Sequence, residues 1–227
     1  MSERFDLVIV GAGPAGLSAA ARAAEIDQEE GRSDPTYLLL ESGAELAQTI
    51  QSYQLGKHVM DEPGFLNLRS PVRFSSGTRE DILLAWEQDV RDAHLNVRYH
   101  SEVTRITGAA PEFEVTLADG GRISCRAVIL ACGTEGNLRL LEVANDAPSP
   151  FVRYGLADPA AVTDRVVVVV GAGDSAIENA LALVATNSVH IVNRRSEFSR
   201  AKSGNLNAIV NAINDPLLGK ECYPTEF

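Results

Sequence analysis

The chain has 227 residues, of which 45% are hydrophobic and 22% are charged, a composition typical of a globular protein with a sizeable core. The formal net charge of -11 argues against a nucleic-acid partner and against an anionic membrane surface. No apolar run reaches the length of a membrane span or a signal peptide, so we expect a soluble, cytoplasmic protein. The cysteines form no Cys-x-x-Cys pair, so neither a zinc site nor a dithiol redox pair is predicted.

The first motif joins a short strand, Leu7–Val10, to a helix over Leu17–Ile26 through the spacing G-x-G-x-x-G. Gly11 permits the tight turn, Gly13 lets the backbone approach a pyrophosphate, and Gly16 lets the helix pack on the strand. The N-terminus of the helix then presents N–H groups and partial positive charge to phosphates. The pattern predicts a dinucleotide-binding turn, and a strand–turn–helix without a ligand is the alternative.

The second strand, Tyr37–Leu40, ends in an acidic residue, Glu41. The dinucleotide fingerprint places the acceptor for a ribose hydroxyl at this point. A polar, turn-rich loop over 27–35 makes the preceding connection longer than usual. We therefore predict that Glu41 binds ribose, and a glutamate on the surface at a strand end remains the alternative.

The next stretch, 43–80, is predicted to be loops around short helices. His58, Asp61 and Glu62 match no metal-ligand spacing, so a solvated loop is favoured and no metal site is predicted. From Arg79 to Ala93 the apolar residues recur at a helical period, and Trp86 among them is predicted to lie in the core.

From residue 96 the pattern changes to period two, which predicts an antiparallel meander with a hairpin turn at Asp119-Gly120-Gly121. A fully apolar strand follows and leads into Cys132 and Gly133, where a glycine permits close backbone approach. The strands predicted here are Asn96–His100, Val103–Thr107, Phe113–Leu117, Arg122–Cys125 and Ala127–Ala131.

A linker composition over 145–164 precedes a second glycine motif. Val166–Val170 is a run of β-branched residues that would be buried on both faces inside a parallel sheet. It leads through Gly171-Ala172-Gly173-Asp174-Ser175-Ala176 into a helix over Ile177–Thr186, with alanine in place of the third glycine.

Basic residues follow the next strand, Val189–Val192, where the first motif has an acidic one. The strand is followed by Asn193-Arg194-Arg195, with Arg200 and Lys202 close behind. Arginine forks suit a ribose 2′-phosphate, whereas a carboxylate suits a free 2′-hydroxyl. The second site is therefore predicted to bind NADP(H), with an arginine pair at a solvated strand end as the alternative.

Two dinucleotide sites of opposite ribose chemistry indicate hydride transfer between two cofactors, a nicotinamide and FAD. The two glycine motifs, Glu41, Ala131-Cys132-Gly133 and Asn193-Arg194-Arg195 together resemble the thioredoxin-reductase-like flavoprotein disulfide reductase superfamily over nearly the whole chain. The resemblance implies that FAD binds the first motif, that the Ala-x-Gly stretch closes over it, and that NADPH binds the second. We assign no catalytic residue, and the predicted cofactor-binding residues are Gly11, Gly13, Pro14, Ala15, Gly16, Glu41, Ser42, Val103, Ala131, Gly133, Gly171, Gly173, Asp174, Ser175, Ala176, Asn193, Arg194 and Arg195.

The chain departs from that superfamily at two points. Thioredoxin reductases carry a Cys-x-x-Cys before the second motif, and this chain has none, which shifts the resemblance toward ferredoxin–NADP reductases or bacillithiol-disulfide-reductase-like proteins. After one more helix, Asn205–Asn214, the chain has no room for a complete second domain or for the C-terminal segment that returns to FAD. We therefore expect part of a reductase: a fragment, or a half that a partner completes.

The predicted fold is α/β, with two Rossmann-like dinucleotide-binding domains, a three-layer sheet with an antiparallel meander in the first, and an incomplete second domain. The expected boundaries are an FAD-binding domain over 1–144, a linker over 145–164 and a partial NAD(P)-binding domain over 165–227. The predicted function is hydride transfer from NADPH to FAD and on to a redox protein such as ferredoxin or to a small disulfide, with a homodimer left open. A non-catalytic nucleotide-binding module and a flavin monooxygenase-like fragment are the alternatives.

Overall fold

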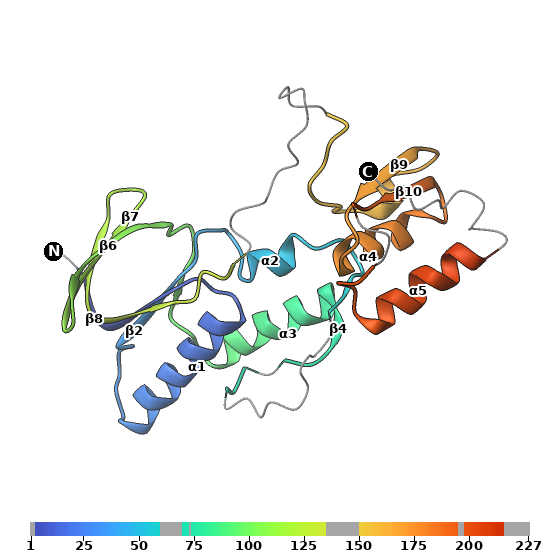
Figure 1. Cartoon of the computed structure of the whole chain (residues 1–227). Helices are drawn as coiled ribbons and strands as arrows, with labels where there is room; N and C mark the ends of the chain where they lie inside the picture. The colour runs from blue at the N-terminus through green and yellow to red at the C-terminus, as the bar shows by residue number, and fades with distance from the viewer. Residues whose placement is uncertain (1–2, 60–69, 73, 135–149, 195–197, 216–227) are drawn as a thin grey trace. The chain divides into compact units, whose positions relative to one another are not determined.

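A computed structural model describes residues 3–59, 70–72, 74–134, 150–194 and 198–215 (Figure 1). The chain divides into two compact units, Met1–Tyr154 and Gly155–Phe227, which we describe one at a time. The elements of the first unit are β1 (Glu3–Val10), α1 (Pro14–Glu29), β2 (Tyr37–Leu40), α2 (Gln48–Gln51), β3 (His58–Val59), β4 (Gly77–Thr78), α3 (Arg79–Asp92), β5 (Val97–Arg98), β6 (Val103–Ala109), β7 (Glu112–Leu117) and β8 (Arg122–Leu130). Those of the second unit are a short 3-10 helix (Pro159–Ala161), β9 (Val166–Val170), α4 (Asp174–Leu183), β10 (Ser188–Val192) and α5 (Ser203–Asn214).

A six-stranded sheet with the order β5-β2-β1-β8-β7-β6 organises the first unit. Strand β1 lies between β2 and β8 and is parallel to both, and β5 is parallel to β2. Strands β7 and β6 extend the sheet in antiparallel pairing. The α/β class with a parallel-rich sheet is therefore confirmed. Strand β1 is a central strand, so the glycine turn at its C-terminal end lies at the middle of the sheet's edge.

Two strand predictions need correction. The segment predicted as Asn96–His100 forms only β5, and it pairs in parallel with β2 instead of joining the meander. The segments predicted as two strands on either side of residue 126 are one continuous strand, β8, because its first half pairs with both β1 and β7 and its second half continues along β1. Periodicity predicts an extended segment but carries no information about which strand it pairs with.

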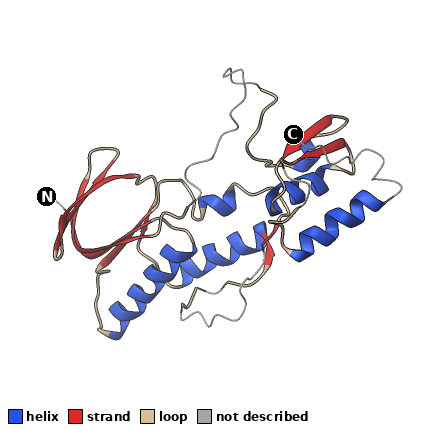
Figure 2. Ribbon diagram, viewed as in Figure 1, coloured by secondary structure: helices blue, strands red, loops and turns tan. Residues whose placement is uncertain are grey.

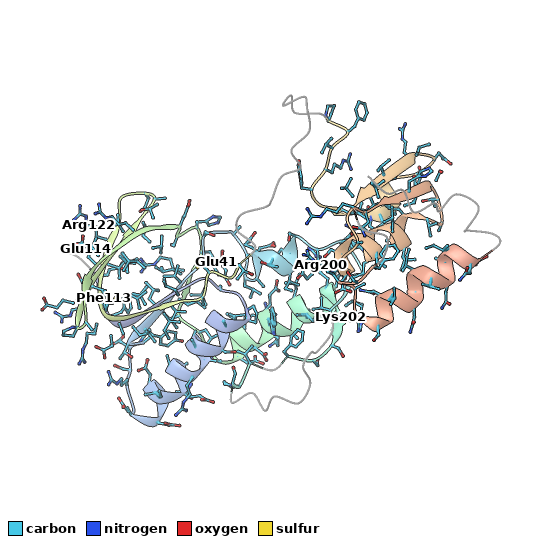
Figure 3. All side chains as sticks on the ribbon, viewed as in Figure 1. Glu41, Phe113, Glu114, Arg122, Arg200 and Lys202 are labelled. Atoms are coloured by element: carbon cyan, nitrogen blue, oxygen red, sulfur yellow. The ribbon has the colours of Figure 1, made fainter. Side chains whose placement is uncertain are left out.

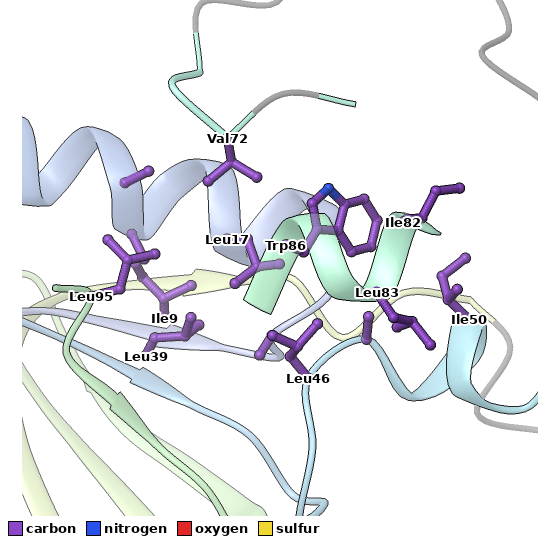
Figure 4. Packing of buried hydrophobic residues seen from close by; sticks show 14 of the residues in the cluster. Ile9, Leu17, Leu39, Leu46, Ile50, Val72, Ile82, Leu83, Trp86 and Leu95 are labelled. Carbon is purple, nitrogen blue, oxygen red and sulfur yellow. The ribbon is translucent and has the colours of Figure 1, made fainter. Parts of the chain in front are cut away.

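Helices α1 and α3 cover one face of the sheet. The core on this face includes Ile9 and Leu39 from the sheet, Leu17 from α1 and Trp86 from α3 (Figure 4). Trp86 is almost fully buried and its ring contacts Phe74, so its predicted core position is confirmed.

The other face of the parallel strands is covered by the antiparallel strands of the same sheet. Val8, Leu38 and Leu40 pack against Val115 and Ile123 of the meander. Figure 2 shows the antiparallel end of the sheet curving round, which brings these residues together. Helices on one side and curved strands on the other therefore hold β1 and β2 in fixed register.

A buried aspartate organises the polar loop that precedes β2. The carboxylate of Asp27 accepts hydrogen bonds from the backbone N–H of Thr36 at 2.9 Å and from its hydroxyl at 2.7 Å. Arg32, in the loop, lies 3.8 Å from the same carboxylate. This contact fixes the entry into β2, so the length of the connection does not disturb the position of Glu41 at its far end.

The second unit contains a parallel pair, β9 and β10, covered on one side by α4. Val167 and Val169 face the α4 side and pack in its apolar cluster. The alternate residues Val166, Val168 and Val170 are 75%, 59% and 57% exposed, respectively. The burial of this strand on both faces, predicted for a place inside a parallel sheet, is therefore not observed, because within the described residues β9 pairs with β10 alone. No helix in the described ranges has the length and apolarity that crossing a membrane requires.

Candidate functional site: two glycine turns with opposite charge

The first glycine turn connects β1 to α1, and two of its glycines are required by the packing. Gly11 has a φ of +101°, and a Cβ there would lie 2.6 Å from the carbonyl oxygen of Ala131. A Cβ at Gly16 would overlap the carbonyl oxygen of Gly11. A side chain at either position would therefore push the turn away from β8 or the helix away from the turn.

Gly13 differs from its neighbours because a Cβ built on it meets nothing within 4 Å. It is the N-cap of α1, and Pro14 occupies the first turn of that helix. The first turn of α1 carries no acidic side chain. An open, positively polarised helix N-terminus without a carboxylate in front of it fits a phosphate group that approaches the backbone closely.

Glu41 lies at the end of β2 and is 5% exposed (Figure 3). Its Oε2 accepts a hydrogen bond from the backbone N–H of Ala12 in the glycine turn at 2.9 Å. Its Oε1 accepts from the N–H of Gly43 at 2.9 Å and from the hydroxyl of Ser42 at 3.1 Å. Three donors from the described residues leave one of the roughly four acceptor positions of a carboxylate, on Oε2, for a ribose hydroxyl.

The residues after β8 complete the surroundings of this turn. The N–H of Ala131 donates to the carbonyl of Val10 at 2.8 Å, which holds the chain beside the turn. Gly133 has a φ of +66°, and a Cβ there would meet nothing within 4 Å. Val103, another predicted cofactor residue, lies at the start of β6 and packs against the meander core, and its cofactor role stays a prediction.

The second glycine turn repeats the backbone geometry of the first, but the first turn of its helix α4 carries an acidic residue, Asp174. Gly171 has a φ of +130°, and its N–H donates to the carbonyl of Val192 at the end of β10 at 2.9 Å. Gly173 is the N-cap of α4, and a Cβ there would meet nothing within 4 Å. The Cβ of Ala176 lies 3.5 Å from where a Cβ on Gly171 would be, so alanine fits where the first turn has its third glycine.

The residues that follow the strand beside the second turn are basic, in contrast to the acidic one that follows the strand beside the first. Asn193 and Arg194 follow β10, and Arg194 is exposed. Arg200 and Lys202 are exposed in the segment that leads into α5 (Figure 3). Arg195, also predicted to bind the cofactor, lies outside the described residues. The two turns therefore differ in charge as the sequence predicts, a buried carboxylate at one and exposed cations at the other.

One pair of contacts near the second turn was not apparent from the sequence. Asp174, the first residue of α4, accepts hydrogen bonds from the backbone N–H of Lys202 and from the side chain of Asn205. Asn205 lies in α5, and no motif spacing relates it to the glycine turn. Only the packing of α5 on α4 brings these residues together.

Within the described ranges, the other reactive groups supply no further centre. The thiol of Cys125 is buried, which raises its pKa and makes it less reactive, whereas Cys132 is exposed beside the first turn. His58 is exposed, and Asp61 and Glu62 lie outside the described residues. Across the described ranges no group of three or more histidine, cysteine, aspartate or glutamate side chains could hold a metal ion.

Comparison with known proteins gives a consistent family. The sequence profile of the pyridine nucleotide-disulphide oxidoreductase family matches residues 8–220. A ferredoxin–NADP reductase of Lactiplantibacillus plantarum is 30% identical over 87% of this chain and 56% of its own length. One of Ignicoccus hospitalis is 31% identical over 95% of this chain and 67% of its own length. The chain thus spans between about half and two thirds of the length of these relatives.

Solved structures agree with this assignment. The bacillithiol disulfide reductase of Staphylococcus aureus is 26% identical, with a TM-score of 0.78 over 93% of this chain and 64% of that one. The thioredoxin reductase of Lactococcus lactis, at 22% identity, shares the fold with a TM-score of 0.72 over 98% of this chain and 64% of that one. The profile match, which covers most of the chain, shows that the protein belongs to the pyridine nucleotide-disulphide oxidoreductase family.

Proposed function

We propose that this protein is an FAD-dependent oxidoreductase, or the nucleotide-binding part of one, that takes electrons from NADPH. The observation that carries the proposal is the contrast between two equivalent turns. Glu41 contacts the first turn through the N–H of Ala12, whereas Arg194 follows the strand beside the second. A carboxylate selects a free ribose hydroxyl and arginine selects a 2′-phosphate, so the two turns suit different nucleotides.

The first turn fits FAD. The open Gly13 and the N-terminus of α1 would hold the pyrophosphate, and the remaining acceptor position of Glu41 would hold a ribose hydroxyl. Ala131 lies against the turn and Gly133 follows two residues later, so both would border the bound cofactor. FAD, when bound, would accept a hydride equivalent from a nicotinamide and release two electrons to an acceptor.

The second turn fits NADPH. Gly173 and the N-terminus of α4 would hold the pyrophosphate, and the exposed Arg194 and Arg200 would bind the 2′-phosphate. This chain's contribution to the reaction is to bind and orient the two nucleotides, since no described side chain is placed as a proton donor.

For the acceptor we propose a small redox protein of the ferredoxin type, taking one electron at a time, or a small-molecule disulfide. Ferredoxin–NADP reductases among the relatives support the first, and the bacillithiol disulfide reductase likeness supports the second. The absence of a Cys-x-x-Cys in the sequence argues against an internal dithiol relay. A homodimer stays a prediction, which sedimentation equilibrium would check.

The test is spectroscopic. The purified protein, mixed with FAD, should acquire a flavin absorption spectrum that bleaches under anaerobic conditions with NADPH in preference to NADH. Failure to take up FAD would refute the proposal. Uptake of both nucleotides without bleaching would instead indicate a non-catalytic binding module. That alternative is tested because the chain spans only 56% of the length of the Lactiplantibacillus plantarum reductase.

A further inference from the structure

Asp174 makes contacts that differ from those expected of a residue facing a phosphate. It is the first residue of α4, directly after the second glycine turn, and its Oδ1 accepts two hydrogen bonds. One comes from the backbone N–H of Lys202 at 2.9 Å and the other from Nδ2 of Asn205 at 2.8 Å. The same amide of Asn205 donates to Oε1 of Glu178, one turn further along α4, at 2.9 Å. Two carboxylates of α4 therefore hold the first turn of α5.

These contacts fix the backbone of the basic segment. Lys202 is the N-cap of α5, and no side chain caps the helix there. The N–H of Ala201 donates to the carbonyl of Phe198 at 3.0 Å, so residues 198–202 form a turn that ends at the Asp174 contact. Arg200 lies within that turn, and Lys202 ends it. One carboxylate thus connects the glycine turn to the segment that carries two exposed cations.

The connection matters because NADP and NAD differ only in the 2′-phosphate. Binding a 2′-phosphate orders the side chains of arginine and lysine and also the backbone that carries them. A backbone that is already fixed removes its own share of that entropic cost. A carboxylate at a helix N-terminus would also repel phosphates, but here its Oδ1 is engaged by two donors from α5. The contacts with α5 therefore give one oxygen of this carboxylate a role other than contact with a phosphate.

We propose that Asp174, together with Asn205, is a positioning residue that sets the preference for NADP over NAD. It acts by holding the backbone of residues 198–202, and with it Arg200 and Lys202, next to the second glycine turn. This inference rests on the proposed NADPH site. It predicts that loss of the contact weakens recognition of the 2′-phosphate and leaves recognition of the shared part of the nucleotide unchanged.

The experiment measures dissociation constants by calorimetry for NADP⁺, NAD⁺, adenosine 2′,5′-bisphosphate and 5′-AMP. Asp174→Ala should weaken NADP⁺ and the bisphosphate by about tenfold or more, and NAD⁺ and 5′-AMP by less than about twofold. Asn205→Ala removes one of the two donors and should give a smaller loss of the same selectivity. Asp158→Ala is the matched control, because that half-buried carboxylate caps the 3-10 helix in the same unit, accepting from the N–H of Ala160.

The outcomes distinguish failure of this inference from failure of the proposed NADPH site. Equal weakening of NADP⁺ and NAD⁺ in Asp174→Ala would show that the residue serves the shared nucleotide contacts, and it would overturn the inference. An NADP⁺ preference that survives in both Asp174→Ala and Asn205→Ala would overturn it as well, while leaving the proposed function intact. A parent protein without any NADP⁺ preference would refute the proposed NADPH site and the inference with it. Should Asp174→Ala fail to fold, Asn205→Ala provides the comparison, because it removes one of the two donors to Asp174 and leaves the carboxylate in place.

Discussion

Alanine substitutions at two glycines of the first turn should separate cofactor binding from folding. Gly13 has an extended N-cap conformation that alanine adopts without strain, and its Cβ would meet nothing within 4 Å. Replacing Gly13 by alanine should therefore cost less than about 1 kcal/mol of stability, the difference between these residues at an N-cap. The new methyl group would occupy the space through which a pyrophosphate reaches the helix N-terminus.

The loss in FAD affinity can be estimated from the hydrogen bonds at stake. A bond between a backbone N–H and a charged phosphate contributes about 1.5–3 kcal/mol, so losing one weakens binding by at least about tenfold. Gly13→Ala should therefore fold as the parent does and bind FAD at least about tenfold more weakly.

Gly16→Ala should show the opposite behaviour. Alanine is about 1 kcal/mol better than glycine inside a helix. Its Cβ would, however, overlap the backbone carbonyl oxygen of Gly11 and lie 3.3 Å from Cδ1 of Leu39. Relief of the overlap requires backbone to move, either at the turn or along the helix. Overpacking of this kind costs about 1–3 kcal/mol, so we expect a net loss of stability.

Urea unfolding followed by circular dichroism measures the stability of both variants, and flavin fluorescence quenching measures FAD affinity. The reasoning is refuted if Gly13→Ala binds FAD with the parent's affinity, since no ligand then needs the open space. It is equally refuted if Gly16→Ala is as stable as the parent.

Three further predictions concern the core and the ribose acceptor. Glu41→Gln turns an amide donor toward backbone N–H groups such as that of Ala12, so it should lose about 1–3 kcal/mol in urea unfolding and bind FAD more weakly. Burial raises the pKa of Tyr37 above its ordinary value of 10.0. As pH rises, Tyr37 therefore ionises first in the unfolded chain, and the free energy of unfolding falls from about pH 10 upward. Tyr37→Phe should reduce that fall, measured by urea unfolding at pH 9 to 11. Trp86→Phe should abolish the intrinsic tryptophan emission, because this is the chain's single tryptophan, and Trp86→Ala should cost about 3–5 kcal/mol by calorimetry.

The glycine spacing predicted the turns well because each glycine has a local steric cause. The positive φ of Gly11 and the close packing at Gly16 are properties of a strand–turn–helix unit, which a short stretch of sequence specifies. The charge contrast between Glu41 and Arg194 was also predictable from local sequence. Both residues follow the strand that lies beside a glycine turn, and that position can be located from the motif spacing.

Pairing between distant segments was less predictable. Residues 96–100 have the alternation of a meander strand, yet β5 pairs in parallel with β2, because that choice depends on which sheet edge is available. The exposure of Val168 has the same origin, since a valine run does not specify whether a second layer covers it. The Asp174–Asn205 contact depends on how two helices cross, which no local pattern encodes.

The pairing of β1 with β8 has a consequence for the order of events during synthesis. Val10 pairs with Leu130, and Gly11 lies against Ala131, so the first turn reaches its final surroundings only after residue 131 has been made. Closing so long a loop carries an entropic cost before its contacts form, and such non-local pairing slows folding. The N-terminal strand can pair with β2 early in synthesis, but its other edge has no partner until β8 has been made. Free flavin added during translation should accelerate folding only in chains that already extend beyond β8.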